Sequence, residues 1–196
     1  MTPLHDAIRS CRLCSAQFAA TATAHVPRPV VWFDPRARLL IAGQAPGTRV
    51  HLSGRPFTDA SGQRLRDWLG LDEAAFHDRA RVAIVPMAFC FPGQDAKGSD
   101  LPPPPLCAAT WRCQAMAALP GVRLTVLLGG AAIRWHLGLR GVDAAARDWR
   151  AHAPGLFPLP HPSWRTVGWQ AANPWFAADL LPALQAAVAG VMEDVV

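Results

Sequence analysis

The 196-residue chain has no apolar run as long as the roughly 18 residues that a membrane-spanning helix requires, so we expect no membrane association. The first residues, MTPLHDAIRSCRLC, lack an apolar signal core, and we interpret them as mature, cytoplasmic sequence. Charged residues are scarce at 17%, and 51% of the residues are hydrophobic, which excludes a disordered tail. A chain of this length is typical of one folded domain, here residues 1–196.

Lysine is nearly absent, and Lys97 is the only one. Arginine therefore supplies almost all of the positive charge in a chain whose net charge is +5. Arginine pairs with phosphate through two parallel hydrogen bonds and stacks on bases, so this composition favours a nucleic-acid partner. A preference for arginine over lysine also arises from codon composition alone. Charge by itself therefore leaves both interpretations open.

The chain also lacks an even number of cysteines, since it has five, at positions 11, 14, 90, 107 and 113. An odd number without a secretion signal disfavours a disulfide framework and favours thiolate ligands or reactive thiols. On spacing alone, four thiolates suit structural zinc and an iron–sulfur cluster equally. Buried thiols that hold no metal are the third interpretation.

Apolar runs predict four short buried strands, the last of them at an edge because it contains a proline: 38–43, 81–89, 123–130 and 156–160. Helical patterns occur at 61–71, 106–119, 130–138 and after Asn173, which is the expected cap of the last helix. Ser61 is the expected N-cap of the first helix, and Pro182 is expected to kink or break the last. Strands that alternate with helices predict an α/β sandwich around a short parallel sheet.

The unusual segments follow these strands directly, where the binding sites of parallel sheets form. They are GQAPG (43–47), CFPG (90–93), GGAA (129–132) and HPSWR (161–165). Residues 43–62, GQAPGTRVHLSGRPFTDASG, predict a long glycine-rich loop that lacks the lysine and hydroxyl residue of a P-loop. We expect the backbone N–H groups of Gln44 and Ala45 to face a small polar ligand instead of a nucleotide phosphate.

Taken together, GQAPG…GRPFTDASG and the later HPS (161–163) resemble the two signature motifs of the uracil-DNA glycosylase superfamily. The resemblance is strongest to the bacterial and archaeal iron–sulfur branches (families 4 and 5) and extends from Cys11 to HPSWR. It implies a three-layer α/β/α sandwich with a central four-stranded parallel sheet. It also implies a monofunctional glycosylase of base excision repair, a monomer that flips a deaminated base, uracil first of all, out of DNA and hydrolyses its N-glycosidic bond.

This resemblance assigns roles to individual residues. His161 donates a hydrogen bond to the leaving base, whose negative charge grows as the bond breaks. Phe57 stacks on the flipped base, and Asp59 orients water and offsets positive charge on the sugar, as in other glycosidic cleavages. For Asp59 the alternative is a helix N-terminal acid near Ser61. The remaining residues expected around the base are Gly43, Gln44, Ala45, Pro46, Gly47 and Ser163.

Trp164 and Arg165 follow the histidine directly. Enzymes that flip bases often insert a bulky side chain into the vacated stack, and the resemblance assigns that role to Trp164. Arg165 is then expected to contact a phosphate or a groove of the DNA. The alternative for Trp164 is an aromatic side chain that only covers the edge of the core.

The same resemblance places Cys11, Cys14, Cys90 and Cys107 at the ligand positions of a [4Fe–4S] cluster with a structural role. Cys113 is the alternative to Cys107 as fourth ligand. From the residues alone, structural zinc or the absence of any metal stays open.

Two departures from the family pattern bear on activity. Ala45 stands where the best-known branch carries its acid, and Pro86 or Met87 stands where an asparagine normally contacts the uracil edge. Backbone groups or Gln44 then have to recognise the base, or the base is hypoxanthine or xanthine. A catalytically inactive protein that binds damaged DNA is the second hypothesis. A nucleotide-binding α/β protein with structural zinc is the third.

Overall fold

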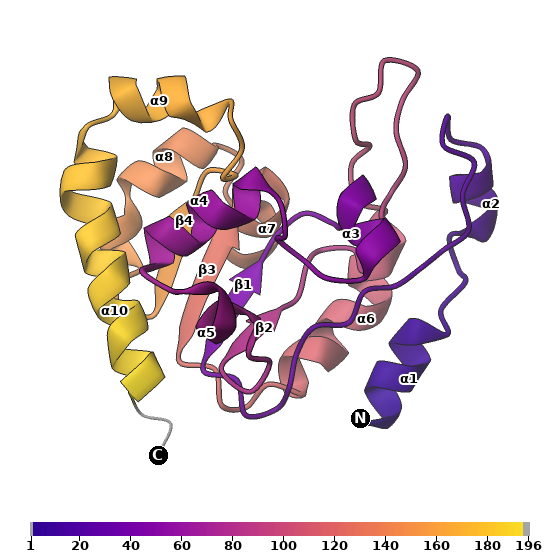
Figure 1. The fold of residues 1–196 in the computed structure, drawn as a ribbon, viewed down its shortest axis with the longest axis horizontal. Helices are drawn as coiled ribbons and strands as arrows, with labels where there is room; N and C mark the ends of the chain where they lie inside the picture. The colour runs from indigo at the N-terminus through magenta and orange to yellow at the C-terminus, as the bar shows by residue number, and fades with distance from the viewer. Residues whose placement is uncertain (1, 194–196) are drawn as a thin grey trace.

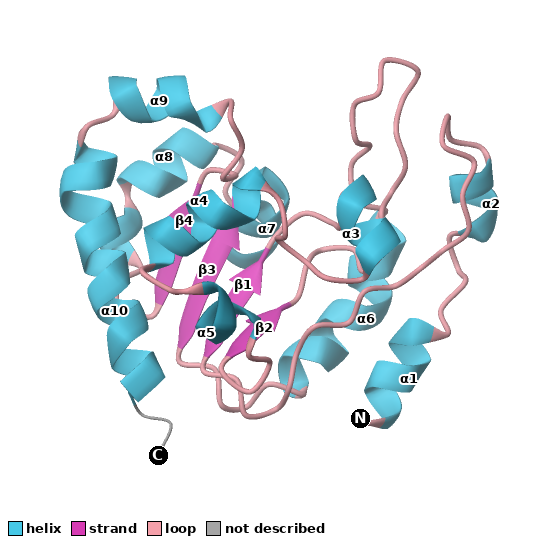
Figure 2. Cartoon of the chain, viewed as in Figure 1, coloured by secondary structure: helices cyan, strands magenta, loops and turns pink. Residues whose placement is uncertain are grey.

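A computed structural model describes residues 2–193, and its centre is one sheet of four parallel strands (Figure 1). The strand order is β2–β1–β3–β4, with bounds β1 Leu39–Ala42, β2 Val82–Ile84, β3 Leu124–Leu128 and β4 Leu156–Leu159. Each neighbouring pair is parallel, so the carboxyl ends of the strands meet at one edge of the sheet (Figure 2). All four predicted strands are present, but β2 ends at Ile84 and not at residue 89. The strand β4 lies at the edge, where Pro158 is tolerated.

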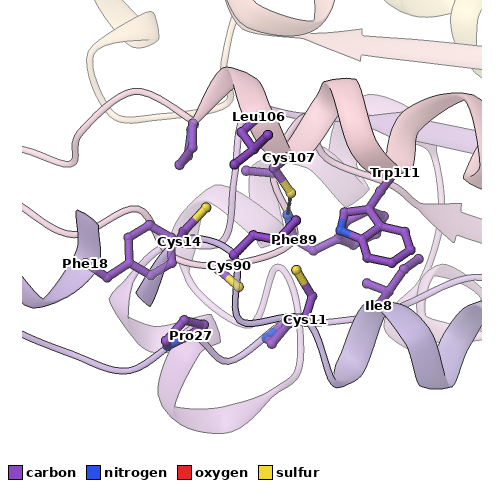
Figure 3. Close-up of a pocket in the computed structure, with 14 residues that line it drawn as sticks. Ile8, Cys11, Cys14, Phe18, Pro27, Phe89, Cys90, Leu106, Cys107 and Trp111 are labelled. Atoms are coloured by element: carbon purple, nitrogen blue, oxygen red, sulfur yellow. Dashed lines mark hydrogen bonds between the residues drawn. The ribbon is translucent and has the colours of Figure 1, made fainter. Parts of the chain in front are cut away.

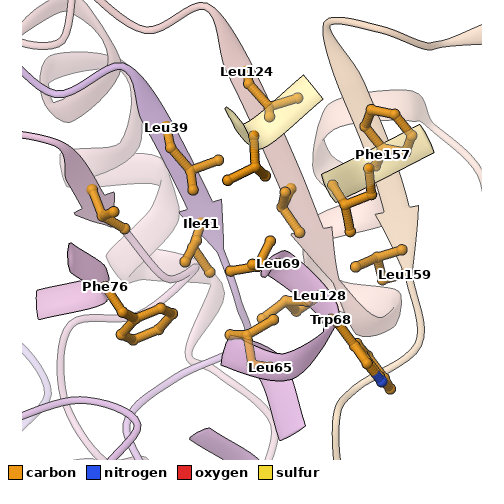
Figure 4. Packing of buried hydrophobic residues seen from close by; sticks show 14 of the residues in the cluster. Leu39, Ile41, Leu65, Trp68, Leu69, Phe76, Leu124, Leu128, Phe157 and Leu159 are labelled. Atoms are coloured by element: carbon orange, nitrogen blue, oxygen red, sulfur yellow. The ribbon is translucent and has the colours of Figure 1, made fainter. Parts of the chain in front are cut away.

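Side chains of the strands alternate between the two faces of the sheet, and helices cover both faces. On one face, Leu39 and Ile41 pack against α4 Ala60–Leu69, α5 Glu73–His77 and α10 Leu181–Glu193 (Figure 4). On the other face, Leu40 packs with α1 Pro3–Arg9 and α6 Pro105–Ala117, and Ala42 packs with α7 Gly129–Leu137 and α8 Val142–Arg147. This arrangement is the expected three-layer α/β/α sandwich. The short helices α2 Ser15–Ala19, α3 Thr48–Ser53, α9 Thr166–Ala172 and η1 Trp149–Ala151 complete the elements near the surface.

The last helical segment changes character where Pro182 predicts a break. A π-helical turn, η2 Phe176–Leu180, runs directly into α10, so the helix does not break at Pro182 and is distorted just before it instead. By length and composition alone, Phe176–Glu193 is apolar enough to cross a membrane, with a mean hydropathy of 1.3. Its apolar residues Phe176, Leu180, Leu184 and Val188 are buried in the cluster on the sheet.

Three local predictions are wrong. The N-cap of α4 is Asp59 and not Ser61, because the Asp59 carboxylate accepts a hydrogen bond from the backbone N–H of Gly62. Residues 43–62 are not one loop, because α3 begins directly after GQAPG and α4 begins at Ala60. Asn173 ends α9 instead of opening the next helix, and its side chain accepts a hydrogen bond from the indole N–H of Trp175 at 3.1 Å.

Candidate active site

The GQAPG segment after β1 lies against the segment that follows β2. The N–H of Met87 donates to the carbonyl of Gly43 at 2.9 Å, and the N–H of Ala88 donates to the carbonyl of Gln44 at 3.1 Å. Pro86 has no N–H group. None of the three residues that follow Val85 therefore has an N–H group left for a ligand, so this stretch cannot replace the donor of the missing asparagine.

Other backbone donors of the GQAPG segment stay available. Among residues 2–193, no group accepts a hydrogen bond from the N–H of Gln44 or of Ala45. Two successive backbone N–H groups without acceptors at the end of a strand suit a polar ligand atom. The expectation that these two residues face a small polar ligand thus remains a prediction that their hydrogen bonding allows.

Phe57 has an unusual backbone conformation for an aromatic residue, with a φ of +56° in the left-handed region. Its ring is partly buried against the main core cluster and lies edge-on to the ring of Phe76, with 5.8 Å between centroids. Its carbonyl oxygen lies so close to Gly62 that a Cβ at that position would come within 1.9 Å of it. Only glycine fits there, which explains the last residue of the FTDASG motif.

Asp59 is both the cap of α4 and a carboxylate whose charge acts on the pKa of His161. One oxygen, Oδ1, accepts a hydrogen bond from the N–H of Gly62 at 3.0 Å. The other, Oδ2, has no hydrogen-bond donor within residues 2–193. The helix-cap interpretation is therefore correct, and it leaves one carboxylate oxygen available for chemistry.

His161 lies just past the end of β4, and its own carbonyl fixes the turn. That carbonyl accepts hydrogen bonds from the N–H of Ser163 at 2.7 Å and from the hydroxyl of Thr166. In the described part of the chain, nothing hydrogen-bonds to the imidazole nitrogens, and the residue is accessible to solvent. Gly129, at the end of β3 with a φ of +78°, would place a Cβ 3.8 Å from the Cβ of His161. The histidine is therefore held by its backbone while its ring remains open to a ligand.

The pKa of His161 is lowered from its ordinary value of 6.5, chiefly because the surrounding protein atoms desolvate the imidazole. The negative charges of Asp59 and Asp100 act in the opposite direction and raise the pKa. Desolvation outweighs them, so the neutral imidazole predominates at neutral pH. A neutral imidazole has one N–H donor, which is the form that the expected donor role requires.

Asp100 is a residue of this site that no sequence motif indicates. It lies on the loop 93–104, which rises beside α3 in Figure 1, and it pairs there with Gln94 in an antiparallel bridge. Its Oδ1 accepts a hydrogen bond from the side-chain amide of Gln94 at 3.0 Å. Its Oδ2 lies 3.7 Å from the place that a Cβ on Gly47 would take, so the carboxylate lies over the end of GQAPG. Only the fold brings Asp100 to the site.

A direct hydrogen bond joins the two motif regions. The guanidinium of Arg64, on α4, donates to the carbonyl of Pro162 at 3.0 Å. The first motif ends on α4 and the second contains Pro162, so this bond fixes their relative position. Of the other predicted site residues, Ser163 is partly buried in the turn after His161.

Trp164 projects from the turn after His161, and 75% of it is exposed. Such exposure disagrees with the alternative in which this side chain covers the core edge. The guanidinium carbon of Arg165 lies 5.6 Å from the centre of the Trp164 ring, within cation–π range. Both side chains are thus placed together on the surface beside the histidine.

The four predicted cysteine ligands come together away from this site. Cys11, Cys14, Cys90 and Cys107 line one cavity between the N-terminal helices, the loop after β2 and α6, and Figure 3 shows their sulfur atoms around a common space. Cys113 is exposed on α6 and does not line it, so its alternative role as fourth ligand is not supported. Burial raises the pKa of Cys90 to about 12 and that of Cys107 to about 11. In residues 2–193, no three histidine, cysteine or acidic side chains are grouped so that they could hold one metal ion.

Comparison with known proteins agrees with the two motifs. The family model of the uracil DNA glycosylase superfamily matches residues 30–185, which include the whole sheet, both motifs, Cys90 and Cys107. A type-5 uracil-DNA glycosylase of Thermus thermophilus is 35% identical over 142 residues. That match covers 68% of this chain and 64% of the length of the relative. The chain belongs to the uracil-DNA glycosylase superfamily.

Proposed function

We propose that this protein is a monofunctional DNA glycosylase that removes uracil from DNA by hydrolysing its N-glycosidic bond. The observation that carries the proposal is the imidazole of His161, which has no hydrogen-bond partner in the described chain and lies near the carboxylates of Asp59 and Asp100. The name of the Thermus relative supports the same activity. Lys97, the single lysine, is exposed on the loop 93–104, and none of its described contacts involves His161, Asp59 or Asp100, so a Schiff-base intermediate is not expected.

In the proposed mechanism, the leaving base gathers negative charge while the deoxyribose gathers positive charge. The N–H of neutral His161 donates to the base and stabilises the anion. Because desolvation already favours the neutral imidazole, no proton has to leave the ring before the reaction. A preorganised donor of this kind typically contributes about 10²–10³ in rate.

The positive charge on the sugar is assigned to the acids. Ala45 supplies no carboxylate in the first motif, but Asp59 has its Oδ2 free of hydrogen-bond donors in residues 2–193. We assign Asp59 the role of orienting the attacking water and offsetting the sugar charge. Asp100 is the second acid whose charge reaches His161, and we assign it a share of the same electrostatic stabilisation.

Base recognition is assigned to Phe57 and to the backbone of the first motif. The exposed part of the Phe57 ring stacks on the flipped base, and the N–H groups of Gln44 and Ala45 donate to its polar edge. No side-chain amide stands at the end of β2, where the family carries its asparagine, because Pro86 and Met87 take that place. This absence favours a less selective pocket, so hypoxanthine and xanthine are included as substrates to test.

For the four clustered cysteines, we propose a structural [4Fe–4S] cluster. A structural zinc ion requires four thiolates at about 2.3 Å from one point. In a [4Fe–4S] cluster each thiolate binds a different iron, so the four sulfur atoms surround a space instead of converging on a point. The cavity with four cysteines on its walls suits such an arrangement, and the resemblance to the iron–sulfur branches favours the cluster over zinc. It would tie the N-terminal helices to the loop after β2.

In the complex with DNA, we propose that Trp164 fills the gap that the flipped base leaves in the stack. Arg165 is assigned a contact with a phosphate or a groove. From the resemblance to the superfamily, we propose a monomer that acts on DNA in the cytoplasm. The test is base release from oligonucleotides that carry uracil, hypoxanthine or xanthine, followed by alkaline cleavage of the abasic sites. Tight binding to uracil DNA without release would favour the inactive damage-binding protein instead.

A further inference from the structure

Arg66 is a buried arginine without a carboxylate partner. It lies on α4, only 7% of it is exposed, and none of the ion pairs described in residues 2–193 includes it. Its Nη1 donates to the carbonyl of Phe57 at 3.1 Å, and its Nη2 donates to the amide oxygen of Gln63 at 2.9 Å. Burial of a guanidinium is unfavourable unless its N–H groups donate hydrogen bonds. The two acceptors, the Phe57 carbonyl and the Gln63 amide, are therefore the groups that Arg66 holds in place.

Phe57 needs to be held. A φ of +56° is strained for an aromatic residue, and such a conformation persists only where surrounding contacts enforce it. The carbonyl that accepts from Arg66 is that of Phe57 itself, and it also rests against Gly62. Arg66 additionally lies 5.8 Å from the centre of the Phe76 ring, which in turn meets the Phe57 ring edge-on. The guanidinium thus contacts both the backbone of Phe57 and the aromatic ring against which the Phe57 ring packs.

We propose that Arg66 is a positioning residue, which locks Phe57 in its left-handed conformation and so presents the ring to the flipped base. The inference rests on the proposed function, because it assigns Phe57 the stacking face. The amide of Gln63 supports the arrangement, since its Nε2 donates to Asp67 at 2.8 Å while its oxygen accepts from Arg66. Nothing in the sequence motif identifies Arg66, which lies beyond the end of FTDASG.

The first test is a double-mutant cycle. Arg66→Gln should lower kcat/KM on uracil DNA by at least about tenfold, because misplacement of a positioned group by about 1 Å can cost about 10²-fold. In a Phe57→Gly background, where the ring is absent and glycine adopts the left-handed conformation freely, the same change should have an effect below about twofold. Binding to DNA that already contains an abasic site should stay within about twofold of the wild type, because no base is stacked there.

Arg112→Gln is the matched control. Arg112 is also buried, at 1% exposure, and donates to the backbone carbonyls of Val85 and Pro86, but it does not contact Phe57. Whatever activity Arg112→Gln loses should be lost equally in the wild-type background and in the Phe57→Gly background. Circular dichroism of each variant checks that it folds.

A second measurement does not depend on activity. Hydrogen exchange of the Gly62 and Gln63 amides, whose N–H groups donate to Asp59, should be at least about tenfold faster in Arg66→Gln and unchanged in Arg112→Gln. If the wild type releases no uracil, the proposed function fails while this measurement still decides the role of Arg66. Unchanged exchange in Arg66→Gln, or an activity loss of equal size in both Phe57 backgrounds, would overturn the inference.

Discussion

The Oδ1 of Asp59 accepts a hydrogen bond from the backbone N–H of Gly62 at 3.0 Å, and Gly62 in turn lies under the carbonyl of Phe57. One short segment therefore contains the helix cap, the proposed acid and the proposed stacking ring. The cap fixes the carboxylate close enough to His161 to raise the pKa of the imidazole against the larger effect of desolvation. A structural role and a catalytic role of Asp59 are thus compatible, and substitutions can separate them.

Asparagine caps a helix as well as aspartate does, whereas alanine does not. Asp59→Asn should therefore keep the melting temperature near that of the wild type while it lowers kcat about 10²-fold through loss of the charge. Asp59→Ala should lose the same activity and also about 1 kcal/mol of stability. Steady-state kinetics and thermal unfolding of both variants test this. Full activity in Asp59→Asn would show that Asp59 acts only as a helix cap and not in catalysis.

Asp100→Asn is the comparison for Asp59→Asn. The amide keeps an oxygen for the hydrogen bond from Gln94 but removes the charge near His161. We expect a loss of about tenfold in kcat, smaller than that of Asp59→Asn, and a larger loss in the double variant than in either single one. Wild-type kcat in Asp100→Asn would show that this carboxylate does not act on the reaction.

The pH dependence follows from the lowered pKa of His161. If neutral imidazole is the donor, activity should be constant above pH 6.5 and fall only below it, because desolvation places the pKa below that value. The free energy of unfolding also falls towards low pH, because the unfolded protein protonates His161 more readily than the folded protein does. The contribution of His161 to stability is fully present above the unfolded pKa and is lost as the pH falls through the lower folded pKa. Asp59→Asn removes a charge that raises the pKa, so the acid limb of the rate profile should move to lower pH. An acid limb above pH 6.5 would contradict the assignment.

The sheet was predictable because buried parallel strands form short apolar runs, which are visible without knowledge of their partners. The end of β2 was not predictable, because the N–H groups of Met87 and Ala88 donate to the GQAPG segment and no local sequence pattern indicates that pairing. The motifs single out His161 and Asp59, whose catalytic roles stay predictions. They do not single out Asp100 and Arg66, because the first is brought in by a long loop and the second acts through a backbone carbonyl.

The cysteine cavity predicts a metal content. Protein purified without oxygen should contain about four iron and about four acid-labile sulfide per chain and absorb in the visible cluster band. Cys90→Ser should lose this absorbance and destabilise the fold, whereas Cys113→Ser should keep it, because Cys113 is exposed outside the cavity. Zinc in place of iron, as a single ion in each chain, would contradict the cluster.

Trp164→Ala should discriminate between forms of DNA. A wedge that fills the vacated stack matters for duplex DNA, where the base has to leave its neighbours, and matters less for a single strand. We expect kcat/KM to fall at least about tenfold on duplex uracil DNA and less than about threefold on the single strand. Trp135→Ala is the control, since Trp135 is 43% exposed but lies on α7, outside the turn after His161. Equal losses on both substrates would argue against the wedge.

Base release by wild-type protein and by His161→Ala, on the same uracil oligonucleotide, tests the central claim most directly. The wild type should release free uracil and leave alkali-labile abasic sites. The variant should fold normally and react about 10²–10³ times more slowly, which is the usual loss when one preorganised donor is removed. Wild-type rates in His161→Ala, or no uracil release by the wild type at high enzyme concentration, would contradict the account.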